Sequence, residues 1–325
     1  MHTPGAVRDT RVRISTIRSQ RVVGRGAPED VTKLAYPVIA VFGPTGSGKS
    51  AVAHQLAVRL GTEVVSADAL QVYVGIPILT NQASTAERLT AFRQLSEEMS
   101  VGEYAALAHA AIDDLVATHG CAVVAGGTGL YLRAALADLG IPGAVAPETR
   151  AKLERLYDAD PKAAYERLVC ADPRAARAVH ANDRRRVVRA LELAEQGDSL
   201  APAAGELWST SMRHPTLVVG LDLPAEELDR RIRVRAEEMI ARGAVAEAEA
   251  AMSGSISKTA EKALGLGELT TLPPGEATER LIGRTRRYAT YQRKWMRRIP
   301  GIELVDANRA PEEVADDVVD LARSR

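Results

Sequence analysis

The sequence predicts an α/β protein: a P-loop NTPase-like parallel sheet flanked by helices, with a smaller all-helical insertion domain. Short apolar runs alternate with helical patterns in the first part of the chain, which is typical of a parallel sheet covered on both faces. The glycine-rich segment Gly43–Ser50 follows the first apolar run and precedes the first helical pattern. A later stretch, 143–205, is rich in alanine and arginine and has no strand signal, which indicates the insertion.

The composition limits the class of protein. A chain of 325 residues suits one large domain with a smaller one. Hydrophobic residues make up 46% and charged residues 26%, which excludes a disordered chain. No apolar run reaches the roughly 18 residues of a membrane span, and two cysteines exclude a disulfide scaffold or a four-cysteine zinc site. The 42 basic and 42 acidic residues balance, so a nucleic-acid surface requires uneven placement of the basic ones.

The N-terminal segment, 1–36, differs from the rest of the chain. Its arginines lie among small and polar residues without sustained periodicity, which predicts a disordered basic tail. The alternative interpretation is a basic arm that contacts RNA phosphates. No apolar segment follows the arginines, so we do not expect a secretory signal, and we expect a cytoplasmic, monomeric protein.

The elements up to residue 142 follow from apolar runs and helical patterns. Continuously apolar runs bounded by glycine predict buried parallel strands, and Gly61 ends the first helix. The predicted strands are 37–42, 63–66 and 121–125, and the predicted helices are 50–60 and 103–118.

The second half of the chain is predicted to be largely helical. Its predicted elements are a helical segment over 143–195, a loop over 197–214, a strand over 218–221, a long charged helix over 228–251 and a final helix over 276–298. The predicted domains are therefore the tail, 1–36, a P-loop catalytic core, 37–142 and 206–325, and the helical insertion, 143–205.

The segment Gly43–Ser50 matches the pattern G-x-x-x-x-G-K-S/T between a strand and a helix. Its glycines allow successive backbone amides to face one anion, and the following helix directs its positive end at the same point. Lys49 adds a mobile charge, and the Ser50 hydroxyl can hold Mg²⁺. The motif predicts phosphate binding but leaves open whether the ligand is a nucleoside triphosphate or another diphosphate.

Two further motifs follow strands and should lie at the same sheet edge, where open α/β sheets bind ligands. Ser66–Tyr73 places Asp68 after the second strand, where its carboxylate can accept a proton or serve as a helix cap. Gly126–Leu132 places the Thr128 hydroxyl and flexible glycines after the third strand.

Together the three motifs resemble those of the tRNA dimethylallyltransferase family. The family pattern is a G-P-T-x-S-G-K-S/T loop, an S-A-D-x-x-Q-V-Y segment and a G-G-T-G-L-Y-L segment, in this order. The resemblance covers about residues 37 to 306 and continues in Asn182–Glu192, Ala263–Glu268, Thr285–Ala289, Gln292, Trp295 and Arg297.

The resemblance implies transfer of a dimethylallyl group from dimethylallyl diphosphate to the exocyclic amine of an adenosine beside the anticodon of tRNA. The implied catalytic residues are Asp68, as general base, Thr128 and Lys49. The implied diphosphate-binding residues are Gly43, Pro44, Thr45, Gly46, Ser47, Gly48, Lys49, Ser50, Arg231 and Arg235. The implied tRNA-binding residues are Asp68, Ala69, Leu70, Gln71, Thr128, Arg150, Arg185, Arg186, Val187, Val188, Arg189, Arg287, Tyr291 and Lys294.

The chain departs from the family pattern in three places. Thr80–Asn81 is more similar to adenylate isopentenyltransferases, which prenylate free nucleotides. The usual H-H-L-I-D stretch is missing before Met99, and the usual A-K-R-Q is Ala289–Gln292 without its two basic residues. Adenylate isopentenyltransferase, a P-loop kinase of a small molecule and a non-catalytic nucleotide-binding module are the alternative functions.

Two basic segments favour the tRNA enzyme over these alternatives. Arg284–Arg298 contains no acidic residue, and Tyr288, Tyr291 and Trp295 share one helical face within it. Asn182 or Asp183 is expected to cap a helix that starts with three arginines, 184–186. The helix macrodipole disfavours positive charges at this end of a helix. Each segment is interpreted as a phosphate-binding face, with a solvated surface and a packed aromatic stripe as the alternatives.

Overall fold

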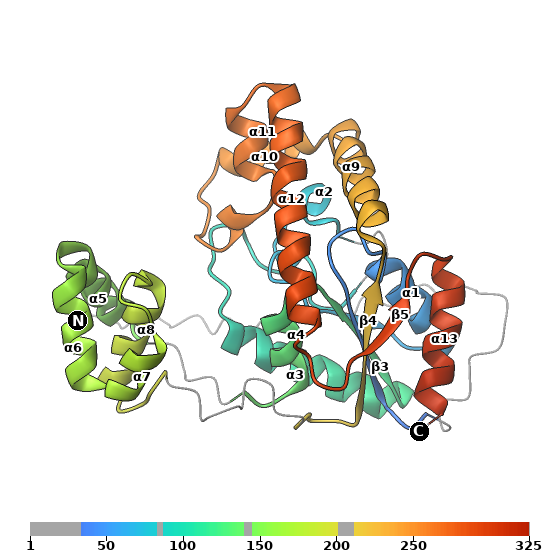
Figure 1. The fold of residues 1–325 in the computed structure, drawn as a ribbon, viewed down its shortest axis with the longest axis horizontal. Coiled ribbons are helices and arrows are strands. Elements are labelled where there is room, and N and C mark those ends of the chain that lie inside the picture. Colours follow the sequence, from blue (N-terminus) through green and yellow to red (C-terminus); the bar gives the residue numbers. More distant parts are fainter. Residues whose placement is uncertain (1–33, 83–86, 140–144, 201–210, 325) are drawn as a thin grey trace, which may run out of the picture.

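The computed structural model describes residues 34–82, 87–139, 145–200 and 211–324. Its core is a five-stranded sheet with strand order β2-β3-β1-β4-β5, and every pair of neighbouring strands is parallel. The strands are β1 (Val38–Phe42), β2 (Val64–Ser66), β3 (Ala122–Gly126), β4 (Thr216–Asp222) and β5 (Glu303–Asp306). Helices cover both faces of this sheet (Figure 1). The predicted fold class is confirmed.

Side chains of β1 alternate between two hydrophobic cores because successive residues of a strand point to opposite faces. Val38, Ala40 and Phe42 pack with α3 (Val101–His119) and α4 (Gly129–Leu136). Ile39 and Val41 pack with α1 (Lys49–Leu60) and α13 (Pro311–Arg323). The longest helix, α12 (Pro274–Met296), contributes side chains to both cores.

Register aligns the loops that follow the central strands. Phe42, at the end of β1, is paired with Gly126 of β3 on one side and Gly220 of β4 on the other. Ser66, at the end of β2, is paired with Ala125. The glycine-rich segment, the Asp68 segment and the Gly127–Thr128 turn therefore leave the sheet at the same edge.

Residues 147–195 form four helices with a hydrophobic core of their own. These helices are α5 (Pro147–Ala159), α6 (Pro161–Ala171), α7 (Pro173–Ala178) and α8 (Arg184–Glu195), and they lie apart from the sheet in Figure 1. Aspartates cap three of them: the side chains of Asp160, Asp172 and Asp183 accept bonds from amides of the first turn of α6, α7 and α8. The predicted boundaries at 143 and 206 lie outside the described residues.

Two predictions for the C-terminal half are wrong. The long helix predicted over 228–251 is two helices, α9 (Ala225–Ala241) and α10 (Ala244–Met252), because Gly243 adopts a left-handed conformation with φ 99° between them. The helix predicted as the final one is α12, and the chain continues into β5 and α13.

Short helices at three places were also not predicted: α2 (Pro77–Thr80), α4 and α11 (Leu266–Thr271). Of the basic tail, residues 1–33 lie outside the described part, as do 201–210 of the predicted loop. Leu34 and Tyr36 pack against the core that contains α13. Among the described helices, none combines the length and apolarity required to cross a membrane.

Candidate active site

The glycine-rich segment forms a phosphate loop between β1 and α1. Gly46 and Gly48 have φ values of 90° and 87°, a conformation that favours glycine, and Gly48 caps α1. A side chain at Gly43 would clash with the Ser47 hydroxyl, so the loop closes tightly on itself. Within the described structure the buried Ser47 hydroxyl has no hydrogen-bond partner. The loop thus presents backbone amides and the positive end of α1 to one small region, as an anion site requires.

Lys49, Asp68, Glu87 and Arg235 form a charged cluster at this edge of the sheet. Burial lowers the pKa of Lys49 to about 8, the charge of Asp68 opposes this shift, and Arg235 adds to it. Burial also lowers the pKa of Arg235, and Asp68 again opposes the shift. The cluster therefore places two partly desolvated cations beside a carboxylate and next to the phosphate loop.

Asp68 lies directly after β2, and its position is held by its own backbone turn. Its Oδ1 accepts a hydrogen bond of 2.9 Å from the amide of Leu70, a side-chain turn that competes with regular structure. Burial raises the pKa of Tyr104, Tyr131 and Tyr288, and the negative charge of Asp68 raises the pKa of each further. The phenols of Tyr104 and Tyr131 already donate to backbone carbonyls, and the phenol of Tyr288 contacts the Thr128 hydroxyl.

Glu87 is a second carboxylate at the site, and it was not predicted from the sequence. Burial raises its pKa to about 7, an effect that Lys49 opposes and Asp68 reinforces. Its neighbour Arg88 pairs with the free edge of β2, because Arg88 donates to the Val64 carbonyl and accepts from the Ser66 amide, both at 2.9 Å. Glu87 stands where the chain departs from the family pattern, so no motif could have marked it.

The turn after β3 brings Thr128 into contact with α12. The Thr128 hydroxyl lies 3.2 Å from the phenol of Tyr288. A side chain at Gly126 would clash with the Ala67 carbonyl, and one at Gly129 would clash with the Trp295 ring. These glycines are therefore required by the close approach of the Asp68 segment on one side and α12 on the other.

Gln292 of α12 connects the phosphate loop with this turn. Its Oε1 accepts a hydrogen bond from the Thr45 amide, and its Nε2 donates one to the Gly127 carbonyl, each at 2.8 Å. The side chain is buried, with an exposed fraction of 2%. The sequence motif contained Gln292 but indicated no role for it.

The two arginines predicted to reach the diphosphate both border the loop. Arg235 belongs to the charged cluster described above. Arg231 donates to Glu227 at 2.6 Å and to Asn308 at 3.3 Å, and its guanidinium lies next to Gly48. Arg231 is therefore ion-paired, whereas Arg235 interacts electrostatically with Lys49 and Asp68.

Comparisons with known proteins show the family of the chain. An IPP transferase family model matches residues 71–299. A tRNA dimethylallyltransferase of Salinispora arenicola is 39% identical over 287 residues, which cover 84% of this chain and 83% of the relative. The chain belongs to the IPP transferase family.

Solved structures of this family share the fold of the chain. The tRNA isopentenylpyrophosphate transferase of Bacillus halodurans has 27% sequence identity and a TM-score of 0.63, and the match covers 88% of this chain and 96% of that one. A eukaryotic dimethylallyltransferase acting on tRNA has 28% identity and a TM-score of 0.71, over 83% of this chain and 73% of that one.

Three residues that the family resemblance assigned to tRNA have side chains that face the protein interior. Val187 and Val188 have exposed fractions of 0% and 2% and pack in the core shared by α5–α8. Gln71 accepts a hydrogen bond from the Ser66 hydroxyl and donates to the carbonyls of Thr80 and Asn81. The side chains of these three residues are thus engaged inside the protein, and their assignment as tRNA contacts stays a prediction. Ala69 and Leu70 are partly buried against the core.

The predicted basic residues of the insertion differ in how they are paired. Arg189 and Arg150 both approach the buried carboxylate of Glu192, at 3.0 and 3.7 Å. Arg186 is exposed and pairs with its helix cap Asp183 at 3.5 Å, and Arg185 is exposed. Arg185 and Arg186 are therefore better placed to meet an external phosphate than Arg150 or Arg189.

The predicted residues of α12 lie on its outer face. Arg287 and Lys294 are accessible at least in part, and Tyr291 has an exposed fraction of 55% while its ring lies edge-on to Trp295. Thr285, Gln292 and Met296 are buried on the inner face. The helix thus separates a basic, aromatic outer surface from an inner surface that contacts the site.

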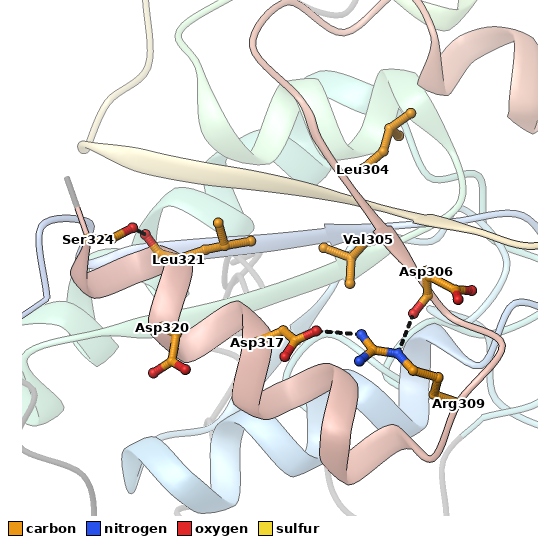
Figure 2. A pocket seen from close by; sticks show the side chains of 8 residues that line it. All are labelled: Leu304, Val305, Asp306, Arg309, Asp317, Asp320, Leu321 and Ser324. Atoms are coloured by element: carbon orange, nitrogen blue, oxygen red, sulfur yellow. Dashed lines mark hydrogen bonds and ion pairs between the residues drawn. The ribbon is translucent and has the colours of Figure 1, made fainter.

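A separate hollow lies between β5 and α13 (Figure 2). Arg309 connects its walls, donating to the Asp306 carbonyl at 3.3 Å and pairing with Asp317. None of the predicted site residues lines it.

Among the described residues there is no group of three or more His, Cys, Asp or Glu side chains that could hold a metal ion.

Proposed function

We propose that this protein transfers a dimethylallyl group from dimethylallyl diphosphate to the exocyclic amine of an adenosine adjacent to the anticodon of tRNA. The single observation that carries the proposal is the charged cluster, in which Lys49 of the phosphate loop and Asp68 interact at one edge of the sheet. Its family relatives include tRNA dimethylallyltransferases, and the names of these relatives supply the transferred group and the acceptor.

The reaction divides between the two sides of this cluster. The phosphate loop, the N-terminus of α1 and Lys49 would bind the diphosphate, which gains negative charge as the carbon–oxygen bond breaks and pyrophosphate leaves. Asp68 would accept a proton from the adenine amine as the new carbon–nitrogen bond forms. Because the amine lone pair is delocalised into the ring, holding both substrates in contact supplies a large part of the rate.

The donor set fits a magnesium ion that arrives with the diphosphate. Ser50 offers one hydroxyl beside the loop, and Mg²⁺ is usually held by few protein groups together with substrate phosphates. Bound there, the ion would neutralise part of the diphosphate charge. Ser50 is the residue that would hold it, and Lys49 acts on the same charge independently.

The tRNA would approach from the side of α8 and α12. Arg185, Arg186, Arg287 and Lys294 are accessible and can meet phosphates of the anticodon stem-loop. The target base must leave its stack to reach Asp68 among buried tyrosines, so the reaction requires base flipping. An enzyme that acts on tRNA in this way would work in the cytoplasm, and a monomer contains every group named here.

One assay tests the proposal against the other functions. Labelled dimethylallyl diphosphate is offered with unmodified tRNA, with AMP or without acceptor, and transfer of label to tRNA alone is expected. Label on AMP would instead identify an adenylate isopentenyltransferase. No transfer to either acceptor, together with ATP-dependent phosphorylation of a small molecule, would overturn the proposal in favour of a kinase.

A further inference from the structure

We infer that Gln292 is a positioning residue that couples tRNA binding on α12 to donor binding in the phosphate loop. The inference rests on the proposed function, because it needs both ligands. It concerns a side chain that is buried and acts through the backbone groups it holds.

The contacts of Gln292 span the whole site. Through Oε1 it holds the Thr45 amide, 247 residues away in the chain, and through Nε2 it holds the Gly127 carbonyl, 165 residues away. A side chain at Gly127 would clash with this amide, so the turn after β3 is shaped to receive it. One side chain therefore sets the distance between the phosphate loop and the Thr128 turn.

This arrangement determines which amides of the phosphate loop are free for the diphosphate. The Thr45 amide points to Gln292 and is satisfied by it. A change in the position of Gln292 would release that partly buried amide and alter the set of donors that the loop presents, because the amide would then need another acceptor.

The same helix carries the outer surface on which tRNA is proposed to bind. Tyr291 and Lys294 lie on the outer face of α12, within two residues of Gln292 on the inner face. Tyr288, one helical turn before Gln292, contacts Thr128. A shift of α12 caused by tRNA must therefore move both Gln292 and Tyr288, and with them the two loops that hold donor and target base.

Coupling between two binding sites is reciprocal, so it can be measured from either ligand. The first experiment determines the Kd of dimethylallyl diphosphate with and without an anticodon stem-loop RNA, for the parent protein and for Gln292→Ala. We expect the RNA to change donor affinity several-fold in the parent, within the range of about 5- to 150-fold that is typical of coupled sites. The ratio should fall towards one in Gln292→Ala.

Thr290→Ala is the matched control. Thr290 lies on the same helix and is exposed, and its hydroxyl donates to the Arg286 carbonyl at 2.9 Å, a bond within the helix itself. This variant should retain the parent ratio. An unchanged ratio in Gln292→Ala, or no coupling in a parent protein that transfers the prenyl group, would overturn the inference.

Gln292→Glu adds a readout that a change in packing would not produce. As a carboxylate, Glu can accept from the Thr45 amide but cannot donate to the Gly127 carbonyl, whereas the protonated acid can do both. At each pH, the coupling and the kcat of Gln292→Glu are compared with those of the parent. Both should approach the parent values as the pH falls. Gln292→Ala should show no such recovery.

The outcomes separate the inference from the proposed function. A parent protein that fails to bind the donor or to modify tRNA would contradict the function itself. A parent that modifies tRNA, together with a Gln292→Glu variant whose relative activity does not change with pH, would contradict only the role of Gln292. Should Gln292→Ala fail to fold, the pH comparison with Gln292→Glu decides alone.

Discussion

The hydroxyl of Thr128 lies 3.2 Å from the phenolic oxygen of Tyr288, which follows it by 160 residues in the chain. Burial raises the pKa of Tyr288 to about 12, and the charge of Asp68 adds to the shift. The phenol is therefore protonated at neutral pH and can donate to Thr128. This contact joins the turn after β3 to α12 beside the proposed general base.

Tyr288→Phe removes this hydrogen bond and keeps the ring. A neutral hydrogen bond contributes about 0.5–1.5 kcal/mol, so kcat/KM should fall roughly 2- to 12-fold. Tyr165→Phe is the control, because its phenol donates to the Ala176 carbonyl at 2.7 Å within the insertion, and this variant should change activity less. Steady-state kinetics with tRNA as the varied substrate checks this, and equal effects of the two variants would contradict it.

Asp68→Asn tests the general base. Asn preserves the shape and can still accept the Leu70 amide bond, but it is a very poor base. The variant should bind tRNA and dimethylallyl diphosphate, while kcat falls on the order of 100- to 10,000-fold. Single-turnover measurement decides: unchanged chemistry with weaker tRNA binding would reduce Asp68 to a positioning residue.

Lys49 should make donor affinity depend on pH. Its pKa in the free protein is about 8, so it loses its charge as the pH rises through that value. Donor affinity should fall above about pH 8, and binding should take up protons in that range, because the diphosphate favours the charged amine. Titrations at several pH values check this, with Lys49→Ala correcting for ionisation of the donor itself.

The same Lys49→Ala variant should be nearly inactive in turnover. Removing one group that stabilises developing charge typically costs on the order of 100- to 1000-fold in rate. A near-normal kcat would contradict the assignment of the phosphate loop to the donor.

The effect of pH on folding stability has the opposite direction to its effect on donor affinity. At Lys49 the folded protein binds fewer protons than the unfolded chain, because its pKa is lower in the folded state. The contribution of Lys49 to the free energy of unfolding therefore increases as the pH rises from about 8 to 10.5.

Arg185 and Arg186 should contribute to the salt dependence of tRNA binding. Replacing both with Ala should reduce the slope of log affinity against log salt by about 0.9, or somewhat less, for each phosphate that the variant no longer neutralises. Donor binding should not change. Arg233→Ala is the control, because Arg233 is ion-paired with Glu279 at 2.7 Å. If the double variant kept the affinity and the salt slope of the parent, Arg185 and Arg186 would be only a solvated surface.

The helices of residues 147–195 should behave as a separate folding unit. Leu168 is fully buried in their core, and Leu168→Ala should cost about 2–5 kcal/mol of the stability of that unit. Hydrogen exchange should accelerate in α5–α8 and remain slow in the sheet. Equal acceleration in both parts would contradict the predicted division of the chain into a core and an insertion.

Features that depend on neighbouring residues could be predicted from the amino-acid sequence. The apolar strand over 37–42, the glycine-rich turn and the helix over 50–60 follow one another directly in the chain, so their order follows from periodicity and turn chemistry. The break at Gly243 was missed because a glycine within a helical pattern is often tolerated. The strand β5 was missed because its four residues are largely accessible and give little alternation.

Which of the remaining side chains serve the site became clear only from the way the elements pack. Gln292 reaches Thr45 across 247 residues, and Glu87 enters the charged cluster from a segment without a motif. Val187, in contrast, occupies a family motif but faces a core. Burial and hydrogen bonding depend on contacts between elements that are distant in the chain. Local sequence patterns indicate that a helix such as α12 forms. Which of its side chains face the site and which face solvent is decided only when the helix packs against the assembled sheet.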